Sequence, residues 1–314
     1  MEKTDRIFVA GHNGLVGSAI FHKLIAEGYK NVLKFDKKEF DLRVPNSVEY
    51  IFKNYSIDYV FLAAAKVGGI MANSQYKGHF IYDNLMIQTN VIHNAYTRGV
   101  KKLLFFGSSC IYPKFAEQPI KEDYFLSGKL EESNDAYAIA KIAGIKMCQS
   151  YTEQYGFNAI SLMPTNLYGP NDNFNLESGH VLPALIKKIH TAKIENKPTI
   201  EVWGTGKARR EFTYVYDLAD AAVFLMNNYD SPEIINVGVG EDITIKELVY
   251  IIASVVGYKG DFIWDRTKPD GTPRKLLNVE KLNNLGWKAK IKLEDGIKET
   301  YKWYKKNFDN VKRL

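Results

Sequence analysis

A tyrosine and a lysine four positions apart, Tyr137 and Lys141, are the residues of this sequence best placed to do chemistry together. Alanine and isoleucine dominate their run, and neither Gly nor Pro interrupts it before Gly144, which predicts a helix. Residues i and i+4 share one helix face. A phenol titrates near pH ~10, and a fixed ammonium beside it lowers that pKa. The pair therefore suits proton transfer to or from an alcohol oxygen. For the pair alone, the alternative is a packed tyrosine beside a solvated lysine.

Three glycines near the N-terminus form a second candidate site. The apolar run Ile7–Ala10 predicts a buried strand, and Gly11, Gly14 and Gly17 follow at three-residue spacing before an amphipathic helix that runs to about Glu27. Glycines at these positions permit a tight turn and let the backbone approach a pyrophosphate at the positive end of the helix. The motif predicts dinucleotide binding, and the alternative is a turn that binds nothing.

The second predicted strand, 31–36, ends in Asp36. An acidic residue at this strand end commonly accepts hydrogen bonds from the adenosine ribose, which favours NAD. Lys37 and Lys38 follow directly and would instead suit a 2′-phosphate, so the sequence leaves the choice of cofactor open. Asp41 and Leu42 are expected on the adenine side of the site.

Strands and helices alternate over about the first 170 residues. Further buried strands are predicted at 59–65, 102–106 and 159–163, with a long helix over about 83–98. This alternation predicts an α/β fold with a doubly wound parallel sheet and a smaller C-terminal substrate domain. We expect the dinucleotide-binding domain to comprise residues 1–170 and about 213–240. The substrate domain is expected to comprise about 171–212 and 241–314, and it contains a basic loop at 268–275.

Composition argues against several classes of protein. The 314 residues carry a formal net charge of +6 and are 46% hydrophobic, and we find no basic block typical of nucleic-acid binding. Two cysteines make a disulfide framework unexpected. We see neither a signal-peptide pattern nor an apolar run near the ~20 residues of a membrane span. These features predict a cytoplasmic protein with reduced thiols, without a membrane or nucleic-acid partner.

Five longer segments resemble one family over most of the chain. They are 64–70, 107–113, 137–144, 164–170 and 268–275. Together with the glycine motif and the Tyr-x-x-x-Lys pair, they are similar to the GDP-L-fucose synthase family, within the extended short-chain dehydrogenases/reductases. The resemblance implies 3,5-epimerisation and NADPH-dependent 4-reduction of a GDP-4-keto-6-deoxy-sugar, most simply GDP-4-keto-6-deoxy-mannose, and no metal.

The resemblance also implies a role for each matching residue. Ser108, Tyr137 and Lys141 would form the reductive triad, and Cys110 and His180 would be the base and acid of epimerisation. The expected cofactor contacts are Gly11, Asn13, Gly14, Leu15, Val16, Gly17, Asp36, Lys37, Asp41, Leu42, Ala64, Ala65, Tyr137, Lys141, Pro164, Asn166, Leu167 and His180. The expected substrate contacts are Ser108, Ser109, Cys110, Asn166, Val181, Lys188, Trp203, Arg210 and Asp270.

The chemistry of a 4-keto sugar agrees with these roles. The ketone acidifies the protons on carbons 3 and 5, so a thiolate at Cys110 can remove one and a protonated His180 can return one to the opposite face. Hydroxyls of Ser108 and Tyr137 can stabilise the enolate oxygen. A hydride then reaches carbon 4 while Tyr137 protonates the oxygen.

One position departs from the family pattern. Asn13 stands where many members carry an arginine beside the 2′-phosphate of NADP. With Asp36 nearby, NADP(H) is still favoured and NAD(H) is possible. The family further implies a homodimer built on the helices near 83–98 and 137–155.

Two other functions remain open from the sequence. A paralogue with the same fold could act as a 4-reductase on a GDP-4-keto-6-deoxy-heptose, with or without epimerisation, because a pocket needs only modest reshaping to admit one more carbon. Residues 171–179 are the expected place for such reshaping. A cofactor-binding regulator without catalysis is the second alternative, and the intact set of Ser108, Tyr137 and Lys141 argues against it.

Overall fold

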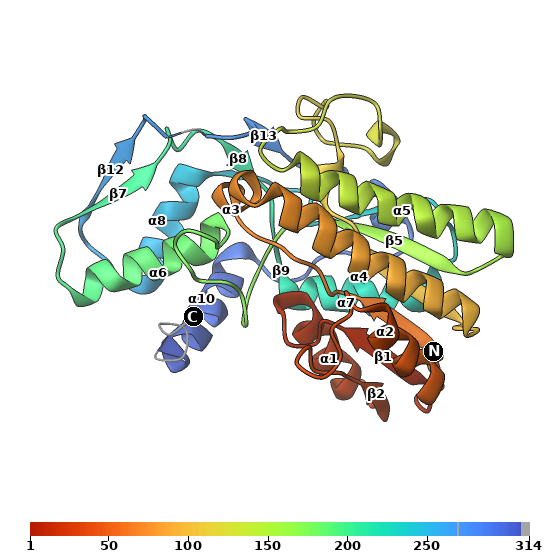
Figure 1. Ribbon diagram of the computed structural model, residues 1–314. Coiled ribbons are helices and arrows are strands. Elements are labelled where there is room, and N and C mark those ends of the chain that lie inside the picture. The colour runs from red at the N-terminus through yellow and green to blue at the C-terminus, as the bar shows by residue number, and fades with distance from the viewer. Residues whose placement is uncertain (269, 309–314) are drawn as a thin grey trace.

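A six-stranded parallel sheet forms the centre of the protein in the computed structural model, which describes residues 1–268 and 270–308 (Figure 1). The strand order is β10-β5-β4-β3-β1-β2, and every neighbouring pair is parallel. The strands are β1 (Arg6–Ala10), β2 (Asn31–Leu33), β3 (Tyr59–Leu62), β4 (Lys102–Phe106), β5 (Ala159–Pro164) and β10 (Ile235–Val237). The expected doubly wound α/β fold is confirmed.

Helices cover both faces of this sheet because successive strand side chains point to opposite faces. Ile7 and Val9 of β1 pack in one core with α1 (Leu15–Ala26) and α7 (Val215–Asn228). Phe8 and Ala10 pack in a second core on the opposite face. The helices of that face are α2 (Pro45–Asn54), α4 (Lys77–Thr97) and α5 (Asp135–Tyr155).

A smaller lobe lies to one side of the sheet and has its own core (Figure 1). Its main elements are α6 (Val181–Ile194), β7 (Thr199–Trp203), α8 (Ile245–Val256), β12 (Asp261–Asp265) and α10 (Leu293–Lys306). Thr244 caps α8 by accepting a hydrogen bond from the Glu247 amide, while the Glu247 carboxylate accepts one from the Thr244 amide.

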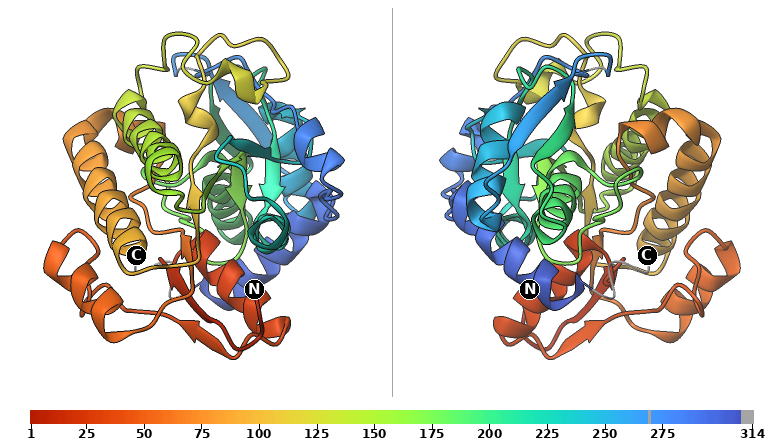
Figure 2. Two further views of the ribbon diagram at one scale, coloured as in Figure 1. Left: turned by 90° about the vertical axis from the view of Figure 1, so that its right-hand side faces the viewer. Right: turned by 90° about the vertical axis from the view of Figure 1, so that its left-hand side faces the viewer.

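The remaining elements are short. They are α3 (Ile70–Gln75), η1 (Ser109–Ile111), η2 (Glu122–Tyr124), β6 (Asn166–Tyr168), β8 (Arg209–Arg210), β9 (Phe212–Tyr214), β11 (Ile243–Thr244), β13 (Arg274–Lys275) and α9 (Glu280–Asn284). β8 lies between β11 and β13, and β6 pairs with β9. The long loop between η1 and α5 projects from the top of the molecule in both views of Figure 2.

Several predicted element boundaries are wrong. β2 ends at Leu33 rather than Asp36, because the Asp36 carbonyl accepts hydrogen bonds from the Glu39 and Phe40 amides and so closes a turn. β3 likewise ends at Leu62, and the helix expected from 83 begins at Lys77.

The C-terminal segment is shared between the two parts of the protein. Leu282 and Trp287, which we expected in the substrate domain, pack instead in the core around β1 and α7. Pro269 of the predicted basic loop and residues 309–314 of the predicted substrate domain lie outside the described residues. The division into a domain of residues 1–170 and about 213–240 and a domain of about 171–212 and 241–314 therefore stays a proposal.

Candidate active site

The glycine turn after β1 leaves no room for side chains. Gly11 has φ of +87°, and a Cβ there would lie 2.7 Å from the Ala64 backbone nitrogen and Cα. A Cβ at Gly17 would overlap the Gly11 carbonyl. The N-cap residue Gly14 provides no side-chain cap, so the first amides of α1, from Leu15 onward, face outward to meet an anion. This cradle fits the pyrophosphate of a dinucleotide and brings the predicted contacts Gly11 and Ala64 together.

The predicted ribose and adenine contacts lie beside this turn. Asp36 is exposed, and its charge acts on His12, whose pKa is lowered by burial and by Lys34 and raised by Asp36. Lys37 is also exposed. Asp41 differs, because its carboxylate is held by Arg43 with an Nη2–Oδ2 distance of 2.6 Å, and this pairing lowers the pKa of Asp41. Asp36 can therefore accept a hydrogen bond from the ribose at the adenosine end of a dinucleotide, and Lys37 places a cation beside the same end.

Ser108 and Tyr137 meet beyond the end of β4. Ser108 caps η1, where its Oγ accepts a hydrogen bond of 3.2 Å from the Cys110 amide. Tyr137 projects from the first turn of α5. Burial and the nearby Cys110 raise the pKa of Tyr137, and its hydrogen bond with Ser108 lowers it. The net direction is opposite to our expectation.

The position of Lys141 explains this difference. Its Nζ donates a 2.7 Å hydrogen bond to the Phe106 carbonyl at the end of β4 and lies 5.9 Å from the centroid of the Tyr137 ring. The side chain is only 3% exposed, and burial lowers the pKa of Lys141 to about 7. A lysine that is partly neutral does not favour a phenolate, so Tyr137 stays protonated and suits proton donation.

Cys110 and His180 are linked by a third residue, Lys275. The Lys275 Nζ lies 3.5 Å from the Cys110 Sγ, and the Asn134 Nδ2 lies 3.2 Å from the same sulfur. His180 is the N-cap residue of α6. Its side chain is open to solvent, yet the surrounding protein and the charge of Lys275 both lower the pKa of His180. Residues from β13, η1 and α6 thus converge on one space.

The predicted sugar-nucleotide contacts divide into two kinds. The charge of Cys110 reaches Arg210, whose pKa is lowered by burial, so Arg210 lies beside the predicted catalytic residues. The Asp270 carboxylate accepts hydrogen bonds from the amide and hydroxyl of Thr205 at 2.7 and 2.6 Å. Its carbonyl accepts from the Arg210 Nη2 at 3.3 Å, so Asp270 orients Arg210.

The other predicted contacts lie on the small lobe and along the strand ends. Trp203 is exposed at the end of β7, with the Lys268 Nζ 5.4 Å from its ring centroid. Lys188 on α6 is half-buried, which lowers its pKa, while Glu201 raises it. Val181 is exposed at the start of α6, and Ser109 is buried, unlike Ser108. Ala65 follows β3, Pro164 ends β5, and Leu167 lies in β6.

Sequence reasoning missed one buried carboxylate, Glu211. Its Oε1 accepts from the Val239 and Gly240 amides at 2.7 Å each, and its Oε2 accepts from the Leu277 amide at 2.9 Å. Its carbonyl also accepts from the Asn166 Nδ2 at 2.8 Å. The only signal in the sequence was an acidic residue directly before the aromatic strand residue Phe212.

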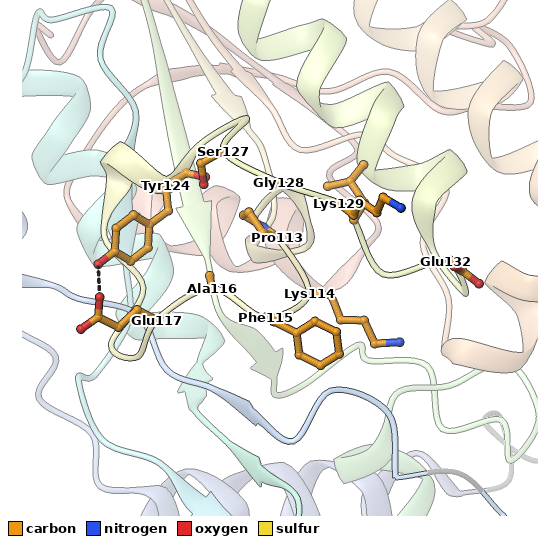
Figure 3. A pocket seen from close by; sticks show the side chains of 11 residues that line it. Pro113, Lys114, Phe115, Ala116, Glu117, Tyr124, Ser127, Gly128, Lys129 and Glu132 are labelled. Atoms are coloured by element: carbon orange, nitrogen blue, oxygen red, sulfur yellow. Dashed lines mark hydrogen bonds between the residues drawn. The ribbon is translucent and has the colours of Figure 1, made fainter.

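A pocket of about 550 Å³ lies in the long loop before α5, and its described lining residues include none of the predicted site residues (Figure 3). The polar side chains around it pair with one another. Lys114 lies 3.0 Å from Glu131, and the Tyr124 hydroxyl donates to Glu117 at 3.2 Å. We therefore treat it as a surface depression, separate from the candidate active site.

Within residues 1–268 and 270–308, no cluster of three or more His, Cys, Asp or Glu side chains is arranged to bind a metal ion. In the same part of the chain, every helix is too short or too polar to cross a membrane.

A parallel sheet with a glycine cradle after β1 and a Ser-Tyr-Lys group beyond β4 defines a dinucleotide-dependent dehydrogenase/reductase or epimerase. Residues 7–238 match the NAD dependent epimerase/dehydratase family, and the chain belongs to that family. The family assignment from sequence is confirmed.

Individual relatives are similar over nearly their whole length. A putative GDP-L-fucose synthase 2 of Arabidopsis thaliana is 58% identical over 98% of this chain and 94% of its own. The GDP-L-fucose synthase of Escherichia coli is 50% identical, with 98% and 99% covered.

Solved structures are also similar over nearly the whole chain. A GDP-6-OMe-4-keto-L-xylo-heptose reductase from C. jejuni has a TM-score of 0.94 at 39% identity, covering 98% of this chain and 99% of that one. A GDP-L-fucose synthetase from Naegleria fowleri bound to NADP has a TM-score of 0.91 at 34% identity, with 98% and 95% covered.

The buried Lys141 predicts a pH-dependent stability. Its pKa of about 7 in the folded protein lies below the ~10.4 of an unfolded lysine. Between these values the unfolded chain binds one more proton, so the free energy of unfolding of the wild type rises with pH. Lys141→Met lacks this gain. The free energy of unfolding of the variant minus that of the wild type should therefore fall by up to ~1.4 kcal/mol per pH unit across this range.

Urea denaturation at a series of pH values from 7 to 9.5 measures this difference, and Lys146→Met on the exposed side of the same helix is the matched control. A difference between Lys141→Met and wild type that stays constant with pH would contradict the assignment of a depressed lysine pKa.

Proposed function

We propose that this protein catalyses 3,5-epimerisation and NADPH-dependent 4-reduction of GDP-4-keto-6-deoxy-mannose, giving GDP-L-fucose. The observation that carries the proposal is the grouping of Cys110, Lys275 and His180 beside the Ser108–Tyr137 pair. A simple reductase needs only the Ser108–Tyr137 pair, which we call the second group; Cys110, Lys275 and His180 are the first group. Identities of 58% and 50% to GDP-L-fucose synthases, over nearly the whole chain, support the same activity.

The epimerisation uses the first group of residues. The 4-keto group of the substrate acidifies the protons on carbons 3 and 5, and the Cys110 thiolate removes one of them. The Lys275 ammonium, 3.5 Å from the Cys110 Sγ, and the Asn134 amide, 3.2 Å from it, stabilise that negative charge. His180 returns a proton to the opposite face. The lowered pKa of His180 makes its protonated form a stronger acid and reduces the share of His180 that is protonated.

The reduction uses the second group. The nicotinamide of the bound cofactor supplies a hydride to carbon 4. Tyr137, kept protonated by its raised pKa, donates its proton to the oxygen on that carbon. The Ser108 hydroxyl accepts from the Cys110 amide and is hydrogen-bonded to Tyr137, so it lies where it can turn to donate to the same oxygen. One pair of hydroxyls thus serves the enolate and then the alcohol.

The cofactor of this proposal is NADP(H), held over the glycine turn. Lys37 and Lys38 follow Asp36, and either ammonium can meet a 2′-phosphate in place of the arginine that Asn13 replaces. The family is NAD dependent, and the structure from Naegleria fowleri contains NADP. NAD(H) remains the alternative.

A GDP-4-keto-6-deoxy-heptose is the second candidate substrate, because the heptose reductase from C. jejuni has the TM-score of 0.94. Identity to the fucose synthases of Arabidopsis thaliana and Escherichia coli is higher, at 58% and 50% against 39%, although the synthetase of Naegleria fowleri is only 34% identical. Rates with the two sugars, compared as kcat/KM on one preparation, discriminate between them, and our proposal requires the higher value for the hexose. A higher value for the heptose would overturn it.

Tyr137→Phe removes the proton donor and retains the ring. We expect NADPH oxidation in the presence of GDP-4-keto-6-deoxy-mannose to fall by ~100-fold to 10,000-fold, the range typical of general acid catalysis. NADPH binding, followed by fluorescence, should persist. Tyr50→Phe, at an exposed tyrosine on α2, is the matched control. Unchanged turnover in Tyr137→Phe would contradict the mechanism, whereas a wild type that binds NADPH but does not oxidise it with this sugar would favour a cofactor-binding regulator.

We also infer a cytoplasmic homodimer. Its two cysteines are unpaired, as in reducing compartments. α4 and α5 pack side by side on the outside of the sheet (Figure 1) and expose large apolar side chains, including Tyr82 at 60% and Ile139 at 47%. Such a surface suits a second copy of this chain.

Sedimentation at micromolar concentration should give about twice the chain mass of 35.8 kDa. Tyr82→Glu should shift it toward the monomer, whereas Tyr250→Glu, on the equally exposed face of α8, should not. A wild-type protein that sediments as a monomer would rule out this interface.

A further inference from the structure

The loop that follows β3 is held in place by buried polar side chains that the mechanism does not use. Asn84 of α4 accepts a hydrogen bond from the Lys66 amide and donates one to the Lys66 carbonyl, each 3.0 Å long. Asn73 of α3 donates to the Gly68 carbonyl at 2.6 Å and to the Gly69 carbonyl at 3.1 Å. Both asparagines are buried, so both ends of the 66–69 loop are fixed.

Ion pairs strengthen the same loop. The Lys66 Nζ lies 3.2 Å from the Oδ2 of Asp83, and the Arg43 Nη1 lies 3.1 Å from the Oδ1 of Asp83. Asp83 is buried, and these two cations lower its pKa. The loop is therefore tied to the side of the domain that carries the predicted adenine contact Asp41, the other partner of Arg43.

This fixed loop touches the backbone just before His180. The Gly69 amide donates a 2.8 Å hydrogen bond to the Ser178 carbonyl. A Cβ on Gly69 would overlap the Gly179 carbonyl oxygen. Only glycine at 69 therefore permits the two backbones to approach this closely.

The segment on the other side of this contact is also ordered by its own hydrogen bonds. The Asn175 Oδ1 accepts from the Glu177 and Ser178 amides at 2.9 and 3.1 Å. The Gly179 amide donates to the Asn175 carbonyl at 2.9 Å. A displacement at Ser178 or Gly179 is consequently passed to the next residue, His180, rather than absorbed within the segment.

We propose that Gly69 is a positioning residue for His180: its amide and its missing side chain set the backbone of Ser178 and Gly179, and so aim the imidazole that returns the proton in epimerisation. The inference rests on the proposed function. It assigns the buried Asn73 and Asn84 a purpose, which is to hold Gly69 at the place where it meets the small lobe. The reductive group, Ser108 and Tyr137, lies on η1 and α5, outside the contact between Gly69 and the segment before His180.

Gly69→Ala tests the proposal because the added methyl group pushes Gly179 away. Epimerisation is followed by mass spectrometry as exchange of ring protons for deuterium when GDP-4-keto-6-deoxy-mannose is incubated with enzyme and NADP⁺ in deuterated water. Hydride transfer is followed separately, as the initial rate of NADPH formation from GDP-L-fucose and NADP⁺. We expect kcat for exchange to fall by ~10-fold to 100-fold with little change in KM, since misplacement by about 1 Å costs that much. Hydride transfer should be largely retained.

Two further variants complete the experiment. Gly78→Ala, at a helical glycine with open space around it, is the matched control and should leave both rates unchanged. Asn73→Ala removes the amide that holds the carbonyls of Gly68 and Gly69 without adding a clash, and it should lower the ratio of exchange to hydride transfer in the same direction. It also keeps the test valid if Gly69→Ala does not fold.

The outcomes separate the two proposals. If the wild type exchanges ring protons and both variants keep its ratio of exchange to hydride transfer, or lose both rates in parallel, the positioning role is wrong and the proposed function stands. If the wild type exchanges no ring protons with this substrate, the proposed epimerisation fails and the role of Gly69 fails with it.

Discussion

The arrangement of the active site depends on one buried carboxylate. Glu211 is fully buried, and its two oxygens accept three backbone amides, from Val239, Gly240 and Leu277. Burial raises the pKa of Glu211 more than these hydrogen bonds lower it, and the net result is a pKa of about 7. A carboxylate buried without such donors is very costly. The segments that carry Val239, Gly240 and Leu277 therefore have to meet at Glu211. Lys275 precedes Leu277 by two residues, and its backbone lies opposite that of Arg210 in the β13–β8 ladder. The hydrogen bonds of Glu211 therefore bring the Lys275 ammonium to Cys110 and set Arg210 beside it.

The parallel sheet supplies the second constraint. Its strands end at one edge, and the glycine turn, the 66–69 loop and Ser108 all follow from strands that end there. The small lobe then brings His180 and Lys275 to that edge from segments far along the chain. Because the 66–69 loop touches the segment before His180, the position of this proposed acid depends on both parts of the protein.

Local patterns predicted most of the fold and the residues at the strand ends. Apolar runs located β1, β4 and β5, and Gly28 correctly ended the first helix, where its φ is +82°. Local patterns could not show contacts made between distant segments. Nothing near Glu211 indicates that its partners lie at 239, 240 and 277, and nothing near Lys275 points to Cys110. The direction of the Tyr137 pKa shift was missed for a similar reason. Helical spacing puts Lys141 on the right face, but it does not reveal the burial that lowers the Lys141 pKa or the bond that directs its Nζ to the Phe106 carbonyl.

The central claim is that one site performs both epimerisation and reduction, and isotope incorporation tests it most directly. The wild-type protein would be incubated with NADPH and GDP-4-keto-6-deoxy-mannose in deuterated water, and the product analysed by mass spectrometry and proton NMR. Our account predicts GDP-L-fucose with deuterium at both carbon 3 and carbon 5. Reduction of the sugar without ring deuterium would contradict it, and would leave Cys110, Lys275 and His180 without the role that their geometry suggests.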